Sequence, residues 1–224
     1  GSRTSVGQAG NYDQNIEWTT SKLIAAYARR FENGWSLSLA PSIIYSTMRS
    51  DIMIANTLQT KGGNSTDESF GAGFTLGVFK KWNKLSFGAT YISRQWSQQF
   101  DQYDDILLRP LDHPQSLQLG IAYALTEDLD ILIDYKWIDW QSIEQLGKST
   151  ALGGFGWNSQ HVYKVGFVWE ATNELTLRAG YSYGKSPIND EDVFANALFA
   201  APIEHHVTCG LSYNINQSLE VDLS

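Results

Sequence analysis

The sequence predicts an all-β protein that forms the wall of an antiparallel, up-and-down transmembrane β-barrel. Three observations predict this fold. Apolar and polar residues alternate with period two through about ten segments, short turns alternate with long loops, and aromatic residues mark both ends of the segments. Period-two alternation gives each strand one apolar and one polar face. Because the polar face carries full charges, we expect it to line a lumen while the apolar face meets lipid.

The composition fits one large domain, residues 1–224, with 42% apolar residues. A formal net charge of -8 argues against a nucleic-acid partner, which requires clustered cations. No apolar run approaches the ~18 residues of a transmembrane helix. The single cysteine, Cys209, excludes an internal disulfide and a cysteine-based zinc site. Its apolar parity indicates a small buried or lipid-facing side chain.

The expected strands follow one another along the whole chain and are bounded by turn residues. In order they are residues 22–30, 35–45, 70–78, 85–91, 117–123, 129–137, 163–170, 175–181, 207–213 and 219–223. Residues 1–20 are polar and contain glycine, so they are expected to form a loop. Pro41 lies inside the second strand and cannot donate to a ladder, so a local bulge is expected there.

Short and long connections alternate between these strands. Tight turns near residues 33, 82, 127, 172 and 215 recur about every 45 residues. Long outer loops are expected near residues 50–68, 97–113, 141–158 and 184–204. Bacterial outer-membrane barrels place short turns in the periplasm and long loops outside. A propeller is disfavoured, because its blades have about four strands per repeat and this unit has two.

Aromatic side chains mark the two expected membrane interfaces. Those beside the short turns are Trp35, Trp82, Tyr123, Trp169 and Tyr213, and those toward the long loops are Tyr45, Tyr91, Trp137, Tyr163 and Tyr181. At ~3.3 Å per residue and ~40° tilt, Trp35 and Tyr45 lie about 25 Å apart along the membrane normal. Two girdles at this separation favour a membrane wall over a soluble lipid-binding barrel, which would place its apolar parity inside.

Six charged residues share the expected inward parity of four successive strands. They are Asp130, Asp134, Lys136, Lys164, Glu170 and Arg178. The favoured interpretation is a lumen held by ion pairs and water. The alternative is a polar track for the head group of a ligand.

No constellation for catalysis or metal binding emerges from the sequence. The four histidines lack a metal-binding spacing, and neighbours His205 and His206 point to opposite faces of a strand. A solvated loop is favoured over a cation site for the acidic residues Asp101, Asp104, Asp105, Asp190, Glu191 and Asp192. The chain has no nucleophile elbow, phosphate loop or convincing acid–base pair. We therefore expect neither enzymatic activity nor a metal or other cofactor.

Several ordered motifs resemble one protein family. The segment 111–143, LDHPQSLQLGIAYALTEDLDILIDYKWIDWQSI, looks like a Pro-Gln-Ser-Leu strand, a turn and an Asp-Trp strand of FadL/TodX outer-membrane transporters. Segments 175–190 and 205–224 are similar to the closing strands of that family, and 31–46 resembles an earlier hairpin. The resemblance covers nearly the whole chain.

The resemblance implies a 14-stranded barrel whose lumen is plugged by an N-terminal hatch. Such proteins lie in the outer membrane of Gram-negative bacteria, among its lipid and lipopolysaccharide, and pass long-chain fatty acids or other hydrophobic compounds by diffusion. This chain shows about ten strands and neither the hatch nor an export signal. We therefore expect it to be an internal part of such a barrel, acting as a monomer.

The resemblance also suggests ligand-binding residues. The loops 50–68 and 97–113 correspond in order to the loops that form the substrate groove. Its apolar surface would come from Ile52, Met53, Ile54, Leu58, Ile106, Leu107 and Leu108, for which ordinary loop packing is the alternative. A fatty-acid carboxylate needs a cation or several donors, and Arg49 and Lys148 are the nearest matches.

Two other functions fit the same wall. A structural or adhesive barrel would use its long loops to bind a surface partner. A general porin would line its lumen with dense charged ladders, whereas several strands here face inward with Gly, Ser and Thr. The favoured prediction is passive transport of hydrophobic compounds, first of all long-chain fatty acids, with aromatic hydrocarbons as the other substrate class.

Overall fold

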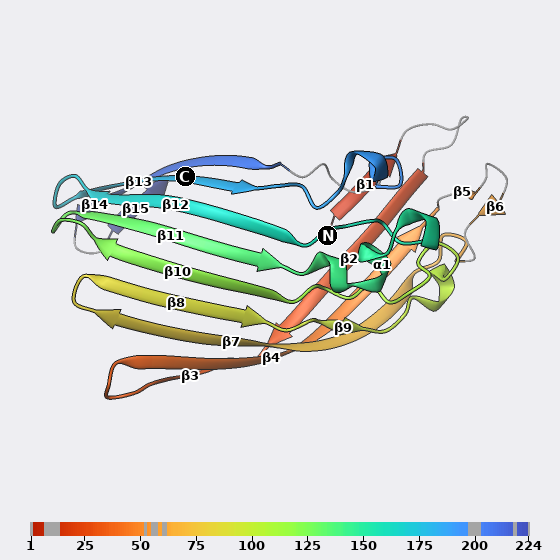
Figure 1. Cartoon of the computed structure of the whole chain (residues 1–224), viewed down its shortest axis with the longest axis horizontal. Helices are drawn as coiled ribbons and strands as arrows, with labels where there is room; N and C mark the ends of the chain where they lie inside the picture. The colour runs from red at the N-terminus through yellow and green to blue at the C-terminus, as the bar shows by residue number, and fades with distance from the viewer. Residues whose placement is uncertain are drawn as a thin grey trace.

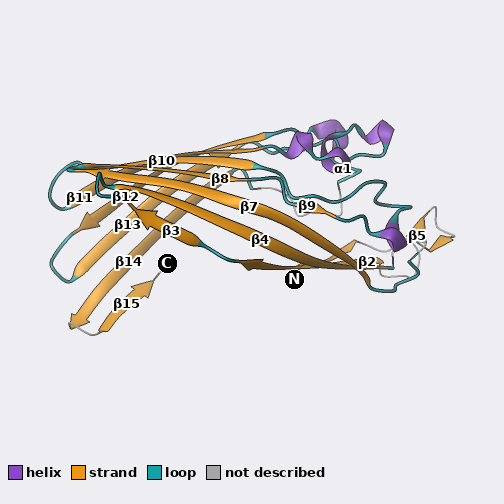
Figure 2. Ribbon diagram, turned by 90° about the horizontal axis from the view of Figure 1, so that it is seen from below, coloured by secondary structure: helices purple, strands orange, loops and turns teal. Residues whose placement is uncertain are grey.

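A computed structural model describes residues 2–6, 14–51, 53–54, 58–59, 62–196, 203–216 and 219–223. These residues form one 13-stranded antiparallel sheet and a separate two-stranded ribbon. The large sheet curls along its length into an open trough (Figures 1 and 2). The predicted all-β, antiparallel wall is therefore confirmed.

Neighbouring strands in the sheet follow one another in the chain. The strands are β1 (Ser2–Val6), β2 (Gln14–Ile24), β3 (Tyr27–Arg30), β4 (Trp35–Ser50), β7 (Asp67–Trp82), β8 (Leu85–Ile92), β9 (Trp96–Ser97), β10 (Ser116–Ala124), β11 (Leu129–Ile138), β12 (Gln160–Glu170), β13 (Leu175–Gly184), β14 (His205–Asn216) and β15 (Leu219–Leu223). The order is β1-β2-β4-β7-β8-β10-β11-β12-β13-β14-β15, with β3 paired to β4 and β9 to β7. The ribbon consists of β5 (Met53–Ile54) and β6 (Leu58–Gln59).

The N-terminal region differs from the prediction. Residues 1–20 were expected to form a loop, but β1 and most of β2 lie there and pair with each other. β2 also pairs with β4 from Ile16↔Ser50 to Ile24↔Ser42. Ile16 and Trp18 are isolated among polar residues in this stretch, so period-two alternation is too weak to reveal the strand. The pairing partner, not the local pattern, determines this strand.

Pro41 does not produce the bulge that was expected. The register of β4 with β7 stays constant from Trp35↔Lys80 to Met48↔Asp67. On the other side the ladder is interrupted between β2 and β3, where the Ala25 N–H donates to the Pro41 carbonyl at 3.1 Å. In an antiparallel strand, the N–H and C=O of one residue point toward the same neighbouring strand. The hydrogen bond that Pro41 cannot donate would therefore fall at this interruption between β2 and β3. The predicted bulge was wrong, because the proline costs one ladder bond without shifting the register.

A bulge occurs instead between β8 and β9. Thr75 on β7 pairs with Ile92, whereas Ala72, three residues earlier on β7, pairs with Trp96, four residues later on the other strand. One extra residue is therefore accommodated within residues 93–95. Bulges of this kind redirect side chains without ending a strand.

Polar side chains satisfy the backbone at this bulge. The Ser93 hydroxyl accepts the Phe74 N–H at 2.9 Å. Gln95 is nearly fully buried, and its Oε1 accepts the Ser42 hydroxyl at 3.1 Å. The Gln95 side chain lies over Gly73, where a Cβ would collide with it. The bulge thus aims Gln95 into the trough.

The two faces of the sheet differ as the alternation predicts. In β4, Leu37, Leu39 and Ile43 are 49%, 49% and 60% exposed, whereas Ile44 and Ser46 are 2% and 4% exposed. The apolar parity therefore lies on the outside of the trough, where a membrane protein meets lipid. A soluble barrel would bury this parity, so the soluble alternative is disfavoured.

Short turns gather at one end of the trough and long connections at the other (Figure 1). At the short end, Gly34 adopts a φ of +81°, which glycine tolerates in a tight turn. The long end carries the helical turns η1 (Asp101–Tyr103), η2 (Trp140–Ser142), α1 (Glu144–Gly147), η3 (Thr150–Leu152) and η4 (Asp190–Asp192), shown in purple in Figure 2. No helix in the described part of the chain is long and apolar enough to cross a membrane.

Candidate functional site

Two outer loops pack an apolar cluster onto the inner face of β4. Its buried members are Met48, Phe100, Tyr103, Leu107, Leu111, Ile143 and Leu146, which are at most 9% exposed. Met48 belongs to the inward parity of β4, and the others come from residues 98–115 and 139–159. The loops therefore fold back over the mouth of the trough instead of extending into solvent.

Tyr103 anchors the first loop to the wall. Its side chain is fully buried, and its hydroxyl accepts the Ser50 N–H at 3.0 Å. The same hydroxyl donates to the Ser65 carbonyl. The ring packs within the cluster, and the hydroxyl bonds to the backbone of both Ser50 and Ser65. Tyr103 therefore holds the first loop to the wall through both packing and hydrogen bonds.

A partly buried ion pair joins the two ends of the first loop. Arg94 Nη2 lies 2.6 Å from Asp112 Oδ2, and Asp112 Oδ1 accepts the Ser97 N–H at 2.7 Å. The Asp112 side chain is only 6% exposed. A buried carboxylate is tolerated because a cation and a backbone donor both satisfy it.

The first loop also binds to α1 in the second loop. The Arg109 N–H donates to Gln145 Oε1 at 3.1 Å, and Arg109 Nε lies 3.3 Å from Glu144 Oε2. Gln145 is 1% exposed and its amide also donates to the Gly153 carbonyl at 3.1 Å. Hydrogen bonding and charge from Lys148 hold the pKa of Glu144 below its usual value. The two loops consequently form one packed unit.

Asp139 joins the second loop to the strand ends below it. Its carboxylate accepts from the Gln115 amide at 2.8 Å and from the Ser159 hydroxyl at 2.9 Å. Partial burial pushes the pKa of Asp139 up, but these bonds and those from Ser142 outweigh it, so the pKa lies below the usual value. Sequence reasoning missed this role. The Asp-Trp motif at Asp139 was the available signal.

Polar atoms without partners lie beside the apolar cluster. Among the described residues, the buried side-chain atoms that find no hydrogen-bond partner are Trp18 Nε1, Arg109 Nη1, His113 Nδ1 and Trp140 Nε1. The Trp18 and His113 rings lie 5.6 Å apart. Burial, reinforced by the charge of Lys22, lowers the pKa of His113 below its usual value. Buried polar atoms without a hydrogen-bond partner are uncommon, so these atoms mark a place where a ligand or water could bind.

The two predicted carboxylate-binding cations are both engaged with this chain. Arg49 Nε donates to Asn64 Oδ1 at 2.7 Å, and Arg49 pairs in register with Glu17 of β2. Lys148 Nζ lies 3.0 Å from Glu144 Oε2, one helical turn away. Neither residue belongs to the apolar cluster, and their role in binding a ligand stays a prediction.

The predicted apolar loop residues have different environments. Leu107 is buried within the cluster and Ile106 packs against it. Leu108 is 54% exposed and packs over Gly153. Ile52 lies outside the described residues, as do the side chains of Met53, Ile54 and Leu58, whose backbone belongs to β5 and β6. Leu108 is therefore the described member of this set that offers the most surface to a ligand.

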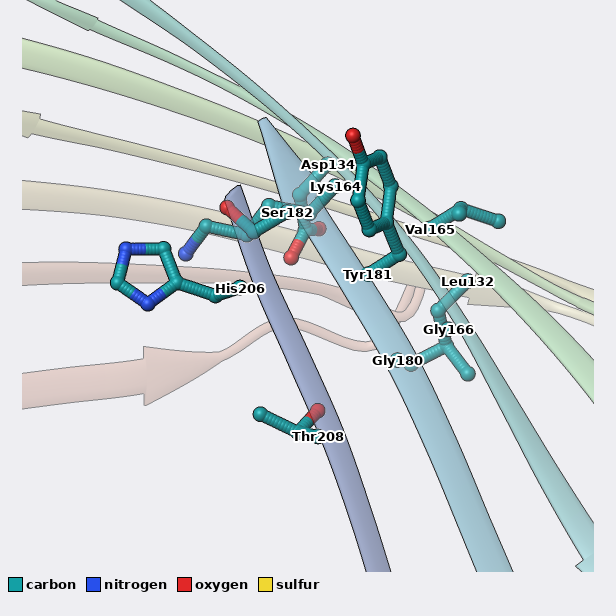
Figure 3. Close-up of a pocket in the computed structure, with 10 residues that line it drawn as sticks. All are labelled: Leu132, Asp134, Lys164, Val165, Gly166, Gly180, Tyr181, Ser182, His206 and Thr208. Atoms are coloured by element: carbon teal, nitrogen blue, oxygen red, sulfur yellow. The ribbon is translucent and has the colours of Figure 1, made fainter. Parts of the chain in front are cut away.

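Deeper in the trough, a polar row crosses adjacent strands. Asp134, Lys164, Ser182 and His206 follow one another in register from β11 to β14. They line an open groove of about 520 Å³ together with Leu132, Gly166, Gly180 and Thr208. Figure 3 shows Ser182 and His206 on one side of the strands and Tyr181 on the other. Two of the six predicted lumen charges thus meet in one place.

The other predicted lumen charges have weaker or different partners. Lys136 lies opposite Gln118 and Val162, and Asp130 lies opposite Val168. Glu170 lies opposite Thr176. Arg178 donates to the Ser212 hydroxyl at 2.5 Å and lies 3.9 Å from Asp222. In the part of the chain that is described, no three metal-ligating side chains are grouped to hold an ion.

Comparison with known proteins assigns the family. The family model described as outer membrane protein transport protein (OMPP1/FadL/TodX) matches residues 33–224. The chain belongs to the FadL/TodX family. This confirms the resemblance found in the sequence and places the chain among outer-membrane proteins. No curated protein matches the chain significantly.

Solved structures share the fold of this FadL/TodX chain at low identity. TbuX, the toluene transporter of Ralstonia pickettii, is 13% identical with a TM-score of 0.64, over 94% of this chain and 62% of that one. A TodX monoaromatic hydrocarbon channel mutant is 16% identical with a TM-score of 0.68, over 98% and 67%. A FadL homologue of Pseudomonas aeruginosa is 16% identical with a TM-score of 0.62, over 94% and 58%. The chain thus spans about three fifths of the length of the first of these relatives.

The pairing of Asp134 with Lys164 in the polar row leads to a prediction about the stability of this FadL/TodX wall. Changing Lys164 to Glu places two carboxylates opposite each other, because Asp134 is its cross-strand partner. We expect a loss of about 1 kcal/mol in unfolding free energy, measured by urea unfolding in lipid vesicles. Lys136→Glu is the matched control, since its neighbours Gln118 and Val162 are uncharged. Equal losses in both variants would argue against pairing between Asp134 and Lys164.

Proposed function

We propose that this chain forms part of the wall of a monomeric outer-membrane channel through which hydrophobic compounds diffuse, and that its substrates are long-chain fatty acids. The observation that carries the proposal is the apolar cluster held by two outer loops against the lumen face of β4, in a FadL/TodX-family chain. Apolar surface at a lumen mouth attracts hydrophobic solutes from water, because their contact removes apolar area from solvent.

The shape of the outer loops supports this assignment. Leu108 and Leu152 are 54% and 64% exposed, and Leu108 packs over Gly153, next to Leu152. An exposed apolar surface therefore adjoins the buried cluster through Leu107, the neighbour of Leu108. A solute that binds at Leu108 would therefore lie next to the cluster.

The unpaired polar atoms support a substrate that carries an acceptor. The Trp18 and Trp140 indoles offer N–H donors beside the cluster, and Lys22 lies close enough to His113 to affect its pKa. A fatty-acid carboxylate that reaches either indole would accept a hydrogen bond from its N–H, and beside Trp18 the Lys22 cation would balance its charge. A hydrocarbon would leave them unpaired, at a cost of about 1–3 kcal/mol for each buried group.

Aromatic hydrocarbons are the second candidate substrate class. TbuX is a toluene transporter and TodX is a monoaromatic hydrocarbon channel, and both share the fold of this chain. The cluster itself contains the aromatic rings of Phe100 and Tyr103, with Trp157 packed against it. Such rings would stack on a small aromatic solute as well as on an acyl chain.

Binding by the full-length protein in detergent distinguishes the two classes. Palmitate and toluene are each titrated and followed by calorimetry. We expect Trp18→Phe, which removes the indole N–H and keeps an apolar ring, to weaken palmitate binding about tenfold and to leave toluene binding unchanged. Arg49→Ala and Lys148→Ala test the two predicted cations. Lys84→Ala, in the short turn at the opposite end, is the control.

Each result assigns a different role. Loss of palmitate binding in Arg49→Ala or Lys148→Ala, with Trp18→Phe unaffected, would move the head-group site to the outer cations. Binding of toluene alone would indicate a hydrocarbon channel. Binding of neither solute would contradict the proposal, and ion conductance would then indicate a general porin, while no conductance would indicate a structural or adhesive barrel.

A further inference from the structure

Two tyrosine–histidine pairs repeat on the outer face of the wall. Tyr135 Oη lies 2.7 Å from His161 Nδ1, and Tyr181 Oη lies 2.7 Å from His205 Nδ1. Both pairs join adjacent strands, β11 to β12 and β13 to β14, and both are diagonal. In each, the histidine lies two residues from the register partner of the tyrosine, on the side of the long loops. The same geometry in successive hairpins indicates a built feature.

The pairs belong to a continuous band of rings. Tyr135, Tyr163, Tyr183 and His205 are register partners across the four strands β11 to β14. Ring centroids lie 5.5 Å apart for Tyr135 and Tyr163 and 4.9 Å apart for Tyr183 and His205. This band lies on the apolar, lipid-facing parity at the end where the long loops begin. His161 and His205 lie two strands apart, about 10 Å across the sheet, and His161 lies two residues nearer the long loops, so the two residues are about 12 Å apart.

The hydrogen bond to tyrosine determines what each imidazole presents outward. A phenol hydroxyl is a stronger donor than a neutral imidazole N–H, so Nδ1 accepts from the tyrosine and the ring proton resides on Nε2. Protonation of the ring would leave a donor on Nε2 as well. Both His161 and His205 are exposed, so each can offer an Nε2–H donor to a molecule outside the wall.

We propose that His161 and His205 bind the phosphate groups of outer-leaflet lipid, namely the phosphorylated glycolipid of the Gram-negative outer membrane. The band lies at the loop end of the lipid-facing surface, which is the level of the head groups in an outer-membrane barrel. Aromatic rings suit this level because one end is apolar and the other polar. A phosphate oxygen accepts an N–H donor strongly, whereas an acyl chain offers no acceptor there.

The test uses the full-length protein in detergent, with native mass spectrometry counting bound lipid. The probes are bis-phosphorylated lipid A and the same lipid after dephosphorylation, at equal concentration. We expect the wild type to bind the phosphorylated form at least tenfold better. The double variant His161→Phe/His205→Phe should lose that preference. Tyr135→Phe/Tyr181→Phe, which keeps every ring but frees the imidazoles, should reduce it about threefold.

His206→Phe is the matched control, because His206 follows His205 directly and faces the trough (Figure 3). It should leave the lipid preference unchanged. Equal binding of both lipids by the wild type, or an undiminished preference in the double histidine variant, would overturn the proposal. So would an equal loss in His206→Phe, or displacement of the lipid by millimolar inorganic phosphate. If the double histidine variant fails to fold, Tyr135→Phe/Tyr181→Phe takes its place in the test. An undiminished preference for the phosphorylated lipid in that variant would then overturn the proposal.

Discussion

Replacing Arg94 with leucine is expected to cost about 3 kcal/mol of unfolding free energy. The change leaves the Asp112 carboxylate, 6% exposed, without the cation that lies 2.6 Å away. Asp112 also accepts the Ser97 N–H, so an uncompensated charge there weakens both ends of the first loop. Urea unfolding in lipid vesicles measures the loss, and hydrogen exchange of residues 98–115 shows whether it begins in the loop.

A second variant separates the charge from the packing. Arg94→Leu/Asp112→Asn removes the charge and keeps an oxygen that can accept the Ser97 N–H. We expect it to recover at least half of the lost stability, because a neutral amide costs less to bury than an unpaired carboxylate. If the double variant were as unstable as Arg94→Leu, the arginine would act through its packing and through its contact with the Ser142 carbonyl.

The wall could be predicted from sequence because contact with lipid favours an apolar side chain at every second residue of a strand. All ten predicted wall strands occur, with 22–30 divided between β2 and β3. In β11, Ile133 is 60% exposed on the lipid side, while Asp134 lines the groove on the other side. Any shift of one residue would place a charge in lipid, so the alternation determines both the strand and its orientation.

The site was harder to predict because its contacts join segments that are far apart in sequence. Gln95 is recognisable as a buried residue only once the bulge turns it toward Ser42. Asp139 gains its role from Gln115 and Ser159, on two other segments. His113 becomes unusual only because β2, which was not expected at residues 14–20, brings Trp18 against it. None of these contacts produces a periodic pattern of apolar and polar residues in the sequence.

One feature of the predicted site could have been anticipated from spacing alone. Glu144 and Lys148 are four residues apart, and such pairs interact when the chain forms a helical turn. The structure contains this turn as α1, and the pair lies at 3.0 Å. A cation already satisfied in this way is a weaker candidate for a ligand carboxylate than the unpaired indole N–H of Trp18.

Tyr103→Ala is expected to release the first outer loop from the wall. The side chain is fully buried within the apolar cluster, and truncating a buried aromatic ring costs about 3–5 kcal/mol. The hydrogen bond from the Ser50 N–H to the hydroxyl, at 3.0 Å, would also be lost. We expect faster hydrogen exchange and protease cleavage within residues 98–115, while the strands β10 to β13 keep their protection.

The conservative variant Tyr103→Phe distinguishes packing from hydrogen bonding at the same position. It keeps the ring in the cluster and removes the hydroxyl from both Ser50 and Ser65, so about 1–2 kcal/mol of unfolding free energy should be lost.

If the cluster holds the loop over the trough, the alanine variant should also bind hydrophobic solutes more weakly, and the phenylalanine variant should bind them nearly as the wild type does. Unchanged exchange in Tyr103→Ala would mean that the ion pair of Arg94 and Asp112 and the contact of Arg109 with Gln145 suffice to hold the loop. We expect Arg94→Leu and Tyr103→Ala to have a much lower unfolding free energy than Tyr103→Phe. This order tests whether burial, rather than any single hydrogen bond, holds the first loop over the trough.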